Sequence, residues 1–360
     1  MKNMVIIIQL LIILGCNDKN KIEKIDILVD NFPHNISLIP EKFTVSSSIF
    51  SPDGMEVVDS FLIIKQSQGV SLFSIFSLPD CKHICDFGKK GHGPGEFIYS
   101  FDFCPLYCEK SGFVVSNKLI SLNYYQIEDL INEKFMPYKV IYLPPKLNRF
   151  REITAIGDSL IFGASYGGNM EMFKFNNISN TLECFREFPD NYPEMSNEHK
   201  TNLYAYFLAS KPDNTQFVRV YESQGKIEVF NLNSNKTIII KYKNFPSLEE
   251  NLHLDNSSRD LRYFTNQKIF CWGIQATNKY IYLRVYNDNY TNIVGDDDLL
   301  RTFIPDIHVF DWNGNPIAKI KISEYFDYYC VDLNDDYIFT CDGYYSDIIC
   351  RYRITNYLKQ

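Results

Sequence analysis

The sequence predicts an all-β protein, a six-bladed β-propeller of four-stranded antiparallel blades, and three observations lead to this fold class. Short apolar runs that alternate with polar residues dominate the chain, and long helical patterns are missing. Aromatic residues make up 15% of the chain, and Phe and Tyr favour strands. Units of similar layout recur at intervals of 51, 47, 57, 63 and 57 residues. Six repeats of a four-stranded unit are typical of a β-propeller.

The N-terminus carries a pattern typical of export. Val5 to Leu14 is apolar except for Gln9, which is too short for a membrane span of roughly 20 residues and suits a signal peptide. Gly15-Cys16 follows directly and resembles the lipobox of bacterial lipoproteins. The resemblance implies cleavage before Cys16 and a diacylglycerol on its thiol. An ordinary signal peptide followed by a chance cysteine is the alternative.

The domain organisation follows from this start. We expect a signal peptide at residues 1–15, a polar tether at 16–30 and the propeller at 31–360. Lipid on Cys16 would hold the protein in the cell envelope, on the periplasmic side or the outer surface. A propeller ring must also be closed. Phe32 to Val45 is expected to pair beside the last three strands of the sixth unit.

The repeating units are defined by their apolar strands and their endings. The apolar strands centre near Ile63, Val114, Ile161, Val218, Ile281 and Ile338. The units end at Phe87-Gly88, Leu143-Pro144, Phe188-Pro189 and Phe245-Pro246, with Ile322-Ser323 as a weaker fifth ending.

Local signals add detail to the later units. Asn313-Gly314-Asn315 predicts a hairpin between Ile307–Trp312 and Ile317–Ile322. Three strands are expected after Tyr328, with turns at residues 334–336 and 342–343. Short helices are expected at 127–132 and 247–251, the second with Ser247 as N-cap and Glu250 three residues on. Residues 287–304 are interpreted as an insertion in the fifth unit.

The glycine-rich segment from Gly88 to Phe97 raises the question of phosphate binding. A P-loop needs Gly-Lys-Ser/Thr before a helix, and neither follows here. We interpret the segment as a crossover between blades, where glycine makes positive φ angles cheap. The residues assigned to this crossover are Gly88, Gly91, Gly93, Pro94, Gly95, Glu96 and Phe97. Glu96 is expected to accept backbone N–H groups within the loop, and Phe97 to anchor between blades.

The same segment carries a family resemblance. "FGKKGHGPGEF", Phe87 to Phe97, looks like the end of an early blade in six-bladed propeller lipoproteins of Gram-negative bacteria, the TolB-like propellers, which are related in pattern to NHL repeats. Ile307–Ile322 resembles their penultimate-blade hairpin. Ser51–Gly54 and Lys211–Asn214 resemble the turn before a blade strand. The resemblance implies a cell-envelope lipoprotein and no known activity, so it supplies no catalytic residue. Units three to five lack the glycine-rich ending.

Composition and motifs argue against several function classes. The formal net charge is −8 and no Lys/Arg cluster is present, so nucleic acid is not an expected partner. The six histidines show no metal-ligand spacing, and Asp296–Asp298 lacks the alternating pattern of a calcium loop. No Gly-x-Ser-x-Gly elbow is present. We therefore expect no metal and no cofactor.

The sequence leaves the state of the ten cysteines open between free thiols and disulfides. Cys81/Cys85 and Cys104/Cys108 are each four residues apart, roughly 13 Å on a strand, which exceeds disulfide reach. Zinc sites more often use other spacings. Buried free thiols, or one or two cross-strand disulfides among residues such as Cys330, Cys341 and Cys350, are the favoured interpretations.

Two hypotheses for function follow. The first is a non-catalytic binding or scaffold propeller that recruits a protein, peptide or glycan. The second is an envelope hydrolase or lyase acting on glycans or peptides at the central funnel, since paired carboxylates could meet there without any sequence motif. His, Asp, Glu or Arg clustered at the axis would favour the enzyme, and an apolar or plainly polar lining would favour binding. The sequence supports the first more strongly and leaves any catalytic residue unknown.

Overall fold

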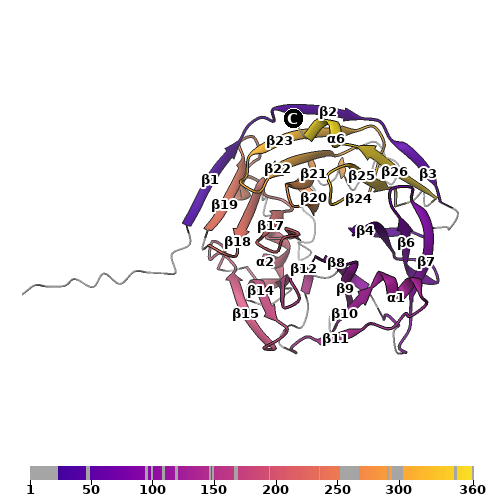
Figure 1. Ribbon diagram of the computed structural model, residues 1–360. Helices are drawn as coiled ribbons and strands as arrows, with labels where there is room; N and C mark the ends of the chain where they lie inside the picture. The colour runs from indigo at the N-terminus through magenta and orange to yellow at the C-terminus, as the bar shows by residue number, and fades with distance from the viewer. Residues whose placement is uncertain are drawn as a thin grey trace, which may run out of the picture.

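A computed structural model shows six β-sheets arranged around a central axis (Figure 1). The structure describes residues 23–45, 49–93, 96–98, 100–107, 110–117, 121–145, 147, 150–165, 169–193, 195–234, 236–251, 267–289, 292–293, 303–343 and 347–358. Each sheet is one blade of a six-bladed propeller, and its own strands pair antiparallel. The predicted fold class is confirmed.

The first strand of each blade lies beside the axis, and the following strands lie successively farther out. Blade 1 contains β4 (Pro52–Val58), β5 (Phe61–Gln66), β6 (Ser71–Ser77) and β7 (Lys82–Lys89), and blade 2 contains β8 (Ser100–Leu106), β9 (Gly112–Asn117), β10 (Ser121–Gln126) and β11 (Lys139–Tyr142). Blade 3 contains β12 (Phe150–Ile156), β13 (Leu160–Ser165), β14 (Met170–Asn176) and β15 (Thr181–Glu187), and blade 4 contains β16 (Tyr206–Ser210), β17 (Gln216–Tyr221), β18 (Lys226–Asn231) and β19 (Lys236–Tyr242). Blade 5 contains β20 (Lys268–Ala276), β21 (Tyr280–Asn289), β22 (Asp306–Asp311) and β23 (Pro316–Ile322), and blade 6 contains β24 (Tyr328–Val331), β25 (Tyr337–Cys341) and β26 (Ile348–Arg353).

Three N-terminal strands, here called the N-terminal belt, run around the outside of blades 4 to 6 (Figure 1). They are β1 (Glu23–Val29), β2 (His34–Leu38) and β3 (Glu41–Thr44). β3 pairs antiparallel with β26 and supplies the fourth strand of blade 6, as expected for ring closure, but His34–Leu38 of the same predicted segment join blade 5 instead. β1 and β2 pair in parallel with β19 and β23, so blades 4 and 5 have five strands.

The N-terminal belt begins inside the segment that was predicted to be a tether. Residues Glu23–Val29, which were expected within it, form β1 and belong to the sheet of blade 4. The reason lies in the alternation of Ile25, Ile27 and Val29 with polar residues, which gives β1 one side that packs inward. Val29 is buried in the core between blades 4 and 5, and Ile27 packs against it.

The predicted repeat matches the strands. The six apolar centres fall in β5, β9, β13, β17, β21 and β25, which are the second strands of the six blades. The predicted unit endings lie at the end of β7 and β23 or shortly after β11, β15 and β19. The hairpin joining β22 to β23 and the strands of blade 6 also form as predicted.

Two of the short helices in the described residues were predicted from the sequence and two were not. α1 (Ile127–Ile131) and α3 (Leu248–Asn251) form where they were expected. The backbone N–H of Glu250 donates to Ser247 Oγ, and the N–H of Ser247 donates to the Glu250 carboxylate, which completes the capping box. α2 (Asn197–Leu203), capped by Ser196, and α6 (Thr355–Leu358) were not predicted.

One turn was assigned wrongly. Ser51–Gly54 resembles a turn before a strand, but Pro52, Asp53 and Gly54 already belong to β4. Gly54 pairs opposite Lys65 of β5, and Asp53 lies 3.0 Å from the Lys65 ammonium. This ion pair across two strands favours an extended backbone over a turn. The second turn, Lys211–Asn214, lies between β16 and β17 as expected.

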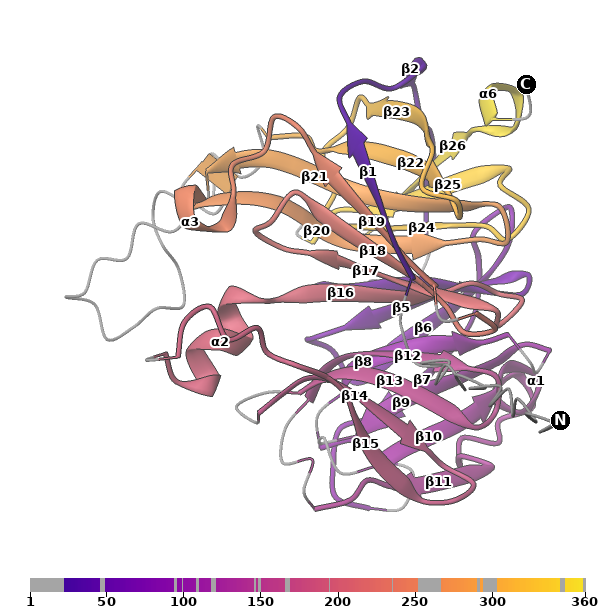
Figure 2. The same cartoon turned by 90° about the vertical axis from the view of Figure 1, so that its left-hand side faces the viewer.

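The strand alternation gives the disc two distinct faces (Figure 2). Connections between the third and fourth strands of a blade lie on one face, and connections from one blade to the next lie on the other. We call the first the α1 face, because it carries α1 and also α6. We call the second the α2 face, because it carries α2 and α3.

Aromatic side chains fill the spaces between blades. Phe162 of blade 3 stacks on Phe217 of blade 4 with ring centroids 4.5 Å apart. Phe87 of blade 1 contacts Phe113 of blade 2 with centroids 5.8 Å apart. Most of the aromatic content therefore serves core packing, the role in which aromatic rings contribute both buried area and specific pair geometry.

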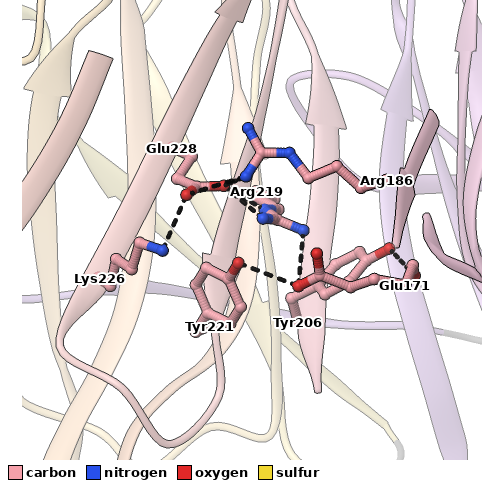
Figure 3. A network of polar contacts seen from close by, with 7 residues as sticks. All are labelled: Glu171, Arg186, Tyr206, Arg219, Tyr221, Lys226 and Glu228. Carbon is pink, nitrogen blue, oxygen red and sulfur yellow. Dashed lines mark hydrogen bonds and ion pairs between the residues drawn. The ribbon is translucent and has the colours of Figure 1, made fainter. Parts of the chain in front are cut away.

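A buried charge network joins blades 3 and 4 (Figure 3). Arg219 of β17 is 1% exposed, and its guanidinium forms an ion pair with Glu228 of β18. Its Nη1 atom lies 3.0 Å from Glu171 Oε1 on β14 of the neighbouring blade. Because both carboxylates are almost fully buried, each depends on Arg219 for compensation.

Further groups complete this network. Arg186 Nη1 lies 3.2 Å from Glu228 Oε2, and Lys226 Nζ lies 2.8 Å from Glu228 Oε1. The Tyr221 hydroxyl donates to Glu171 Oε1 at 3.1 Å. Burial by itself would raise the pKa of Glu228, but Arg219, Lys226 and Arg186 outweigh it and lower the pKa to about 2. Glu228 therefore stays ionised in the core.

The network predicts a large loss of stability on Arg219→Met. This change leaves two carboxylates buried with less compensation, and removal of one partner of a buried pair typically costs about 3–5 kcal/mol. Chemical denaturation measures the free energy of unfolding. Lys226→Met is the matched control, because Lys226 is 28% exposed and Glu228 keeps both arginines. Equal losses in the two variants would contradict the central role of Arg219.

Candidate functional site

The candidate site is the central channel, where the innermost strands of all six blades converge. A cavity of 230 Å³ lies on the axis and is lined by residues of β4, β8, β12, β16, β20 and β24, with Lys65 and Arg284 reaching it from the second strands of blades 1 and 5. Inner strands leave alternate side chains pointing to the axis, so a channel lined by six strands collects groups that are distant in the sequence.

Glu56 and Gln275 bridge the channel between blades 1 and 5. Glu56 lies on β4, and its Oε1 atom accepts a hydrogen bond from Gln275 Nε2 of β20 at 3.0 Å. Burial raises the pKa of Glu56 to about 8, and the hydrogen bond from Gln275 lowers it by a smaller amount. The side chain is therefore largely protonated at neutral pH, which makes it a hydrogen-bond donor as well as an acceptor.

Two cations border the same cavity. Lys65 is buried and pairs with Asp53 at 3.0 Å. Arg284 of β21 donates from Nε to the carbonyl of Trp272 and stacks beside Tyr286, with 5.6 Å from guanidinium carbon to ring centroid. Gly273 follows Trp272 within β20 with φ +138°, a backbone conformation that residues with side chains rarely adopt and that glycine adopts at low cost.

Asp327 and Trp272 bring hydrogen-bonding and aromatic groups to the channel. The Asp327 carboxylate accepts from the Tyr325 hydroxyl at 2.6 Å and from the Gly343 N–H at 2.7 Å. The Trp272 indole N–H donates to Glu222 Oε1 at 2.9 Å. These bonds orient both groups, so the cavity is bounded by fixed polar and aromatic surfaces.

The lining is mixed in chemistry. Half-buried aromatic rings line the cavity from blades 2, 4, 5 and 6, namely Phe103, Phe207, Trp272 and Tyr328. Carboxylates line it from blades 1, 3 and 6, namely Asp53, Glu56, Glu152 and Asp327. Apolar walls with a few convergent polar groups are typical of small-molecule sites. At 230 Å³ the cavity is below the common range of roughly 300–1,000 Å³, so it accommodates one small ring or side chain of a ligand.

None of the predicted crossover residues that the structure describes lines this cavity. Gly88 lies in β7 with φ +79°, and a Cβ atom there would approach the Phe73 ring to 2.9 Å. The Gly93 N–H donates to Glu96 Oε2 at 2.8 Å, Gly91 lies beside the same carboxylate, and Phe97 is fully buried. Cys16, Pro94, Gly95 and Asp296–Asp298 lie outside the described residues.

Other predicted features were also located. The cysteines that the structure describes are free thiols, and Cys350 pairs opposite Thr340 and not opposite Cys341, so no bridge forms among the strands of blade 6. Among residues 23–358 that are described, no group of three or more His, Cys, Asp and Glu side chains could hold a metal ion. Within that same part, no helix is long and apolar enough to cross a membrane.

Sequence comparison identifies the family. The profile of the TolB-like 6-blade propeller-like family matches residues 33–334, most of the chain. The chain belongs to this family. Among curated proteins, no significant match was found.

A solved structure agrees with this TolB-like propeller in fold. A member of the DUF4221 family from Bacteroides vulgatus has a TM-score of 0.61 at 10% identity, with 88% of this chain and 97% of that chain covered. A protein of unknown function from Bacteroides thetaiotaomicron has a TM-score of 0.48 at 11% identity, with 87% and 72% covered. At such low identity the likeness to the first concerns the fold alone.

The channel residues of this TolB-like propeller were not predicted from sequence. Glu56 stands between Met55 and Val57 in β4, and Glu152 precedes Ile153 in β12; a carboxylate beside buried apolar residues is a local signal for a polar group facing a special environment. Arg284 and Asp327 carry no comparable signal, because only the closure of the ring brings blades 5 and 6 next to blade 1.

Glu56 predicts a pH dependence of stability. Its pKa is higher in the folded state, about 8, than its ordinary value of 4.5, so the folded state retains a proton that the unfolded state releases between these values. Stability should therefore fall as the pH rises from about 5 to 8. Glu56→Gln removes this slope and stabilises the protein at pH 8 by up to about 4 kcal/mol. Thermal unfolding at pH 5 and pH 8 measures it, and an unchanged slope in the variant would contradict the assignment.

Proposed function

We propose that this protein is a cell-envelope lipoprotein whose propeller is a binding module, with the central channel as the recognition site for part of a protein, peptide or glycan. The observation that carries the proposal is the cavity on the axis, where all six blades contribute. Its small volume suits one terminal sugar ring or one side chain, with the rest of the ligand lying across a face of the disc.

The polar groups of the channel support recognition of neutral polar groups. Glu56 and Gln275 offer both donor and acceptor atoms, and Trp272 and Tyr328 offer flat aromatic surfaces. Lys65 is already paired with Asp53, whereas Arg284 uses one of its N–H donors, Nε, for a backbone carbonyl and borders the cavity as a further hydrogen-bond donor. Hydroxyl or amide groups on a small ligand match this set of hydrogen-bonding partners.

Trp272 gives a direct test of binding in the channel. The chain has two tryptophans, and Trp312 donates to the Thr277 carbonyl in the core, so Trp312→Phe leaves Trp272 as the single tryptophan, which can be excited selectively over the tyrosines. Titration with defined oligosaccharides and short peptides should give a saturable change in emission for one class. Arg284→Met should weaken that binding about 10-fold or more, as expected for loss of a hydrogen bond to a charged group.

Arg186→Met is the matched control for this titration, because Arg186 belongs to the blade 3–4 network and does not line the cavity. Binding that is equally affected by both arginine changes, or by neither, would count against the channel as the recognition site.

A hydrolase or lyase is the second candidate, and Glu56 is the observation that favours it. A carboxylic acid kept protonated near neutral pH, in a cavity that Asp53, Glu152 and Asp327 also line, is an arrangement that can serve general acid catalysis. Product formation during the same titrations, lost in Glu56→Gln with binding retained, would favour this candidate over the binding module.

The lipid anchor is supported by the sequence Ile13-Leu14-Gly15-Cys16 behind an apolar signal segment. In a Gram-negative host, the wild type should sediment with membranes and be released by detergent, whereas Cys16→Ala should not. Cys184→Ala is the control, because Cys184 is an exposed thiol of the propeller. Membrane association that survives Cys16→Ala would contradict the anchor.

A further inference from the structure

An exposed apolar patch lies on the α1 face, over blades 2 and 3. It consists of Ile131, Phe135, Met136 and Tyr138, between β10 and β11, and Ile178, between β14 and β15. Their exposed fractions are 40%, 42%, 56%, 45% and 77%. Both segments join the third strand of a blade to the fourth, so both lie on the same face of the disc (Figure 2).

Tyr124 connects the two halves of this patch. Its ring lies 6.2 Å from the Tyr138 ring, and its hydroxyl accepts a hydrogen bond from Asn177, the residue before Ile178. The Lys139 ammonium lies over the same ring at 4.8 Å. Buried Tyr124 therefore holds the two exposed segments next to each other, and their surface combines apolar side chains with Tyr138 and the neighbouring Lys139. Contiguous exposed patches of this kind mark interaction sites, and this combination is found at membrane–water interfaces.

The position of β1 indicates what covers the patch. Glu23, the first residue of β1, pairs with Lys236 directly after the connection between β18 and β19 of blade 4. That is again a connection between third and fourth strands. Blades 2, 3 and 4 are consecutive in the ring, so the chain enters the propeller next to the patch and on the same side.

The length of chain before β1 limits its distance from a lipid anchor. From Cys16 to Glu23 there are seven residue steps, which span at most about 25 Å when fully extended. A folded body of this size is roughly 50 Å across. An anchor on Cys16 therefore keeps blade 4 close to the bilayer, at the side where β1 begins.

We propose that the α1 face rests on the lipid bilayer through this patch, which turns the α2 face toward the aqueous compartment. The inference rests on the lipid attachment proposed for Cys16, and it adds the orientation of the propeller. With the α1 face against the membrane, a large ligand reaches the channel from the α2 face, where α2 and α3 border the ring (Figure 2).

Two exposed phenylalanines provide a matched test. Phe135 belongs to the patch and is 42% exposed, whereas Phe50 is 54% exposed and packs beside Gly69 in the turn between β5 and β6, on the α2 face. Phe135→Trp and Phe50→Trp are made separately in the acylated full chain. Each is bound to phosphatidylethanolamine–phosphatidylglycerol vesicles that contain bromine-labelled lipid, which quenches only nearby indoles. Met136→Trp and Val70→Trp form a second pair with the same design, since Val70 is 82% exposed in the β5–β6 turn.

We expect the tryptophan emission that Phe135→Trp or Met136→Trp adds to that of the wild type to shift to the blue and to be quenched on vesicles. The emission added by Phe50→Trp or Val70→Trp should show neither change. Trp preference for the interface makes the substitutions at the patch compatible with binding. Thermal unfolding of each variant confirms that the propeller is intact.

The other outcomes overturn the proposal in distinguishable ways. Flotation with vesicles without quenching at 135 and 136, or with quenching at 50 and 70 instead, overturns the orientation and leaves the anchor in place. Failure of the acylated chain to float with vesicles overturns the anchor and the orientation together. A blue shift at 135 without vesicles, together with a dimer in sedimentation, would assign the patch to a second copy of the chain.

Discussion

The pairing of β3 with β26 is the constraint on which the rest of the structure depends. Blade 6 draws three strands from the C-terminal end of the chain and its fourth from residues 41–44, so the ring closes only when both ends of the sequence meet. The belt strengthens this closure, because β1 and β2 extend the outer edges of blades 4 and 5 before the chain reaches β3. Edges that would otherwise expose unpaired backbone groups are covered by the same segment.

The two polar centres of the molecule satisfy their charges in different ways. In the blade 3–4 network, Arg219 is enclosed and each carboxylate has cationic partners, so the charges are balanced within the core (Figure 3). In the channel, Glu56 has an amide partner and, within the part of the chain that the structure describes, no cation in hydrogen-bond contact, and burial keeps it protonated. The first arrangement stabilises the contact between blades. The second leaves hydrogen-bonding capacity that a ligand can use.

The order of strands within each blade determines both where the channel lies and where the chain enters the propeller. Because every blade begins at the axis and ends at the rim, the inner strands collect the recognition groups, while the belt and the patch lie toward the outside. A chain that enters at the rim of blade 4 can be anchored close to a surface without obstructing the axis. A binding module on a short tether needs this separation of anchor and site.

Sequence by itself determined the number of blades, their second strands and the closing segment. These features depend on alternation of apolar residues and on turn residues, which are local properties that act over a few neighbours. The same is true of the capping box at Ser247 and Glu250. The assignment of Ser51–Gly54 failed because pairing with β5, where Pro52 lies opposite Gln66 and Gly54 opposite Lys65, decides the backbone there.

Only the tertiary structure decided where the functional groups meet. Glu56 and Gln275 are 219 residues apart, and Arg219 reaches Glu171 across a blade boundary. No local pattern encodes such pairs, because their proximity arises from the curvature and closure of the whole ring. The elevated pKa of Glu56 has the same origin: it is a consequence of enclosure by six strands, and an isolated β4 would leave the carboxyl in water.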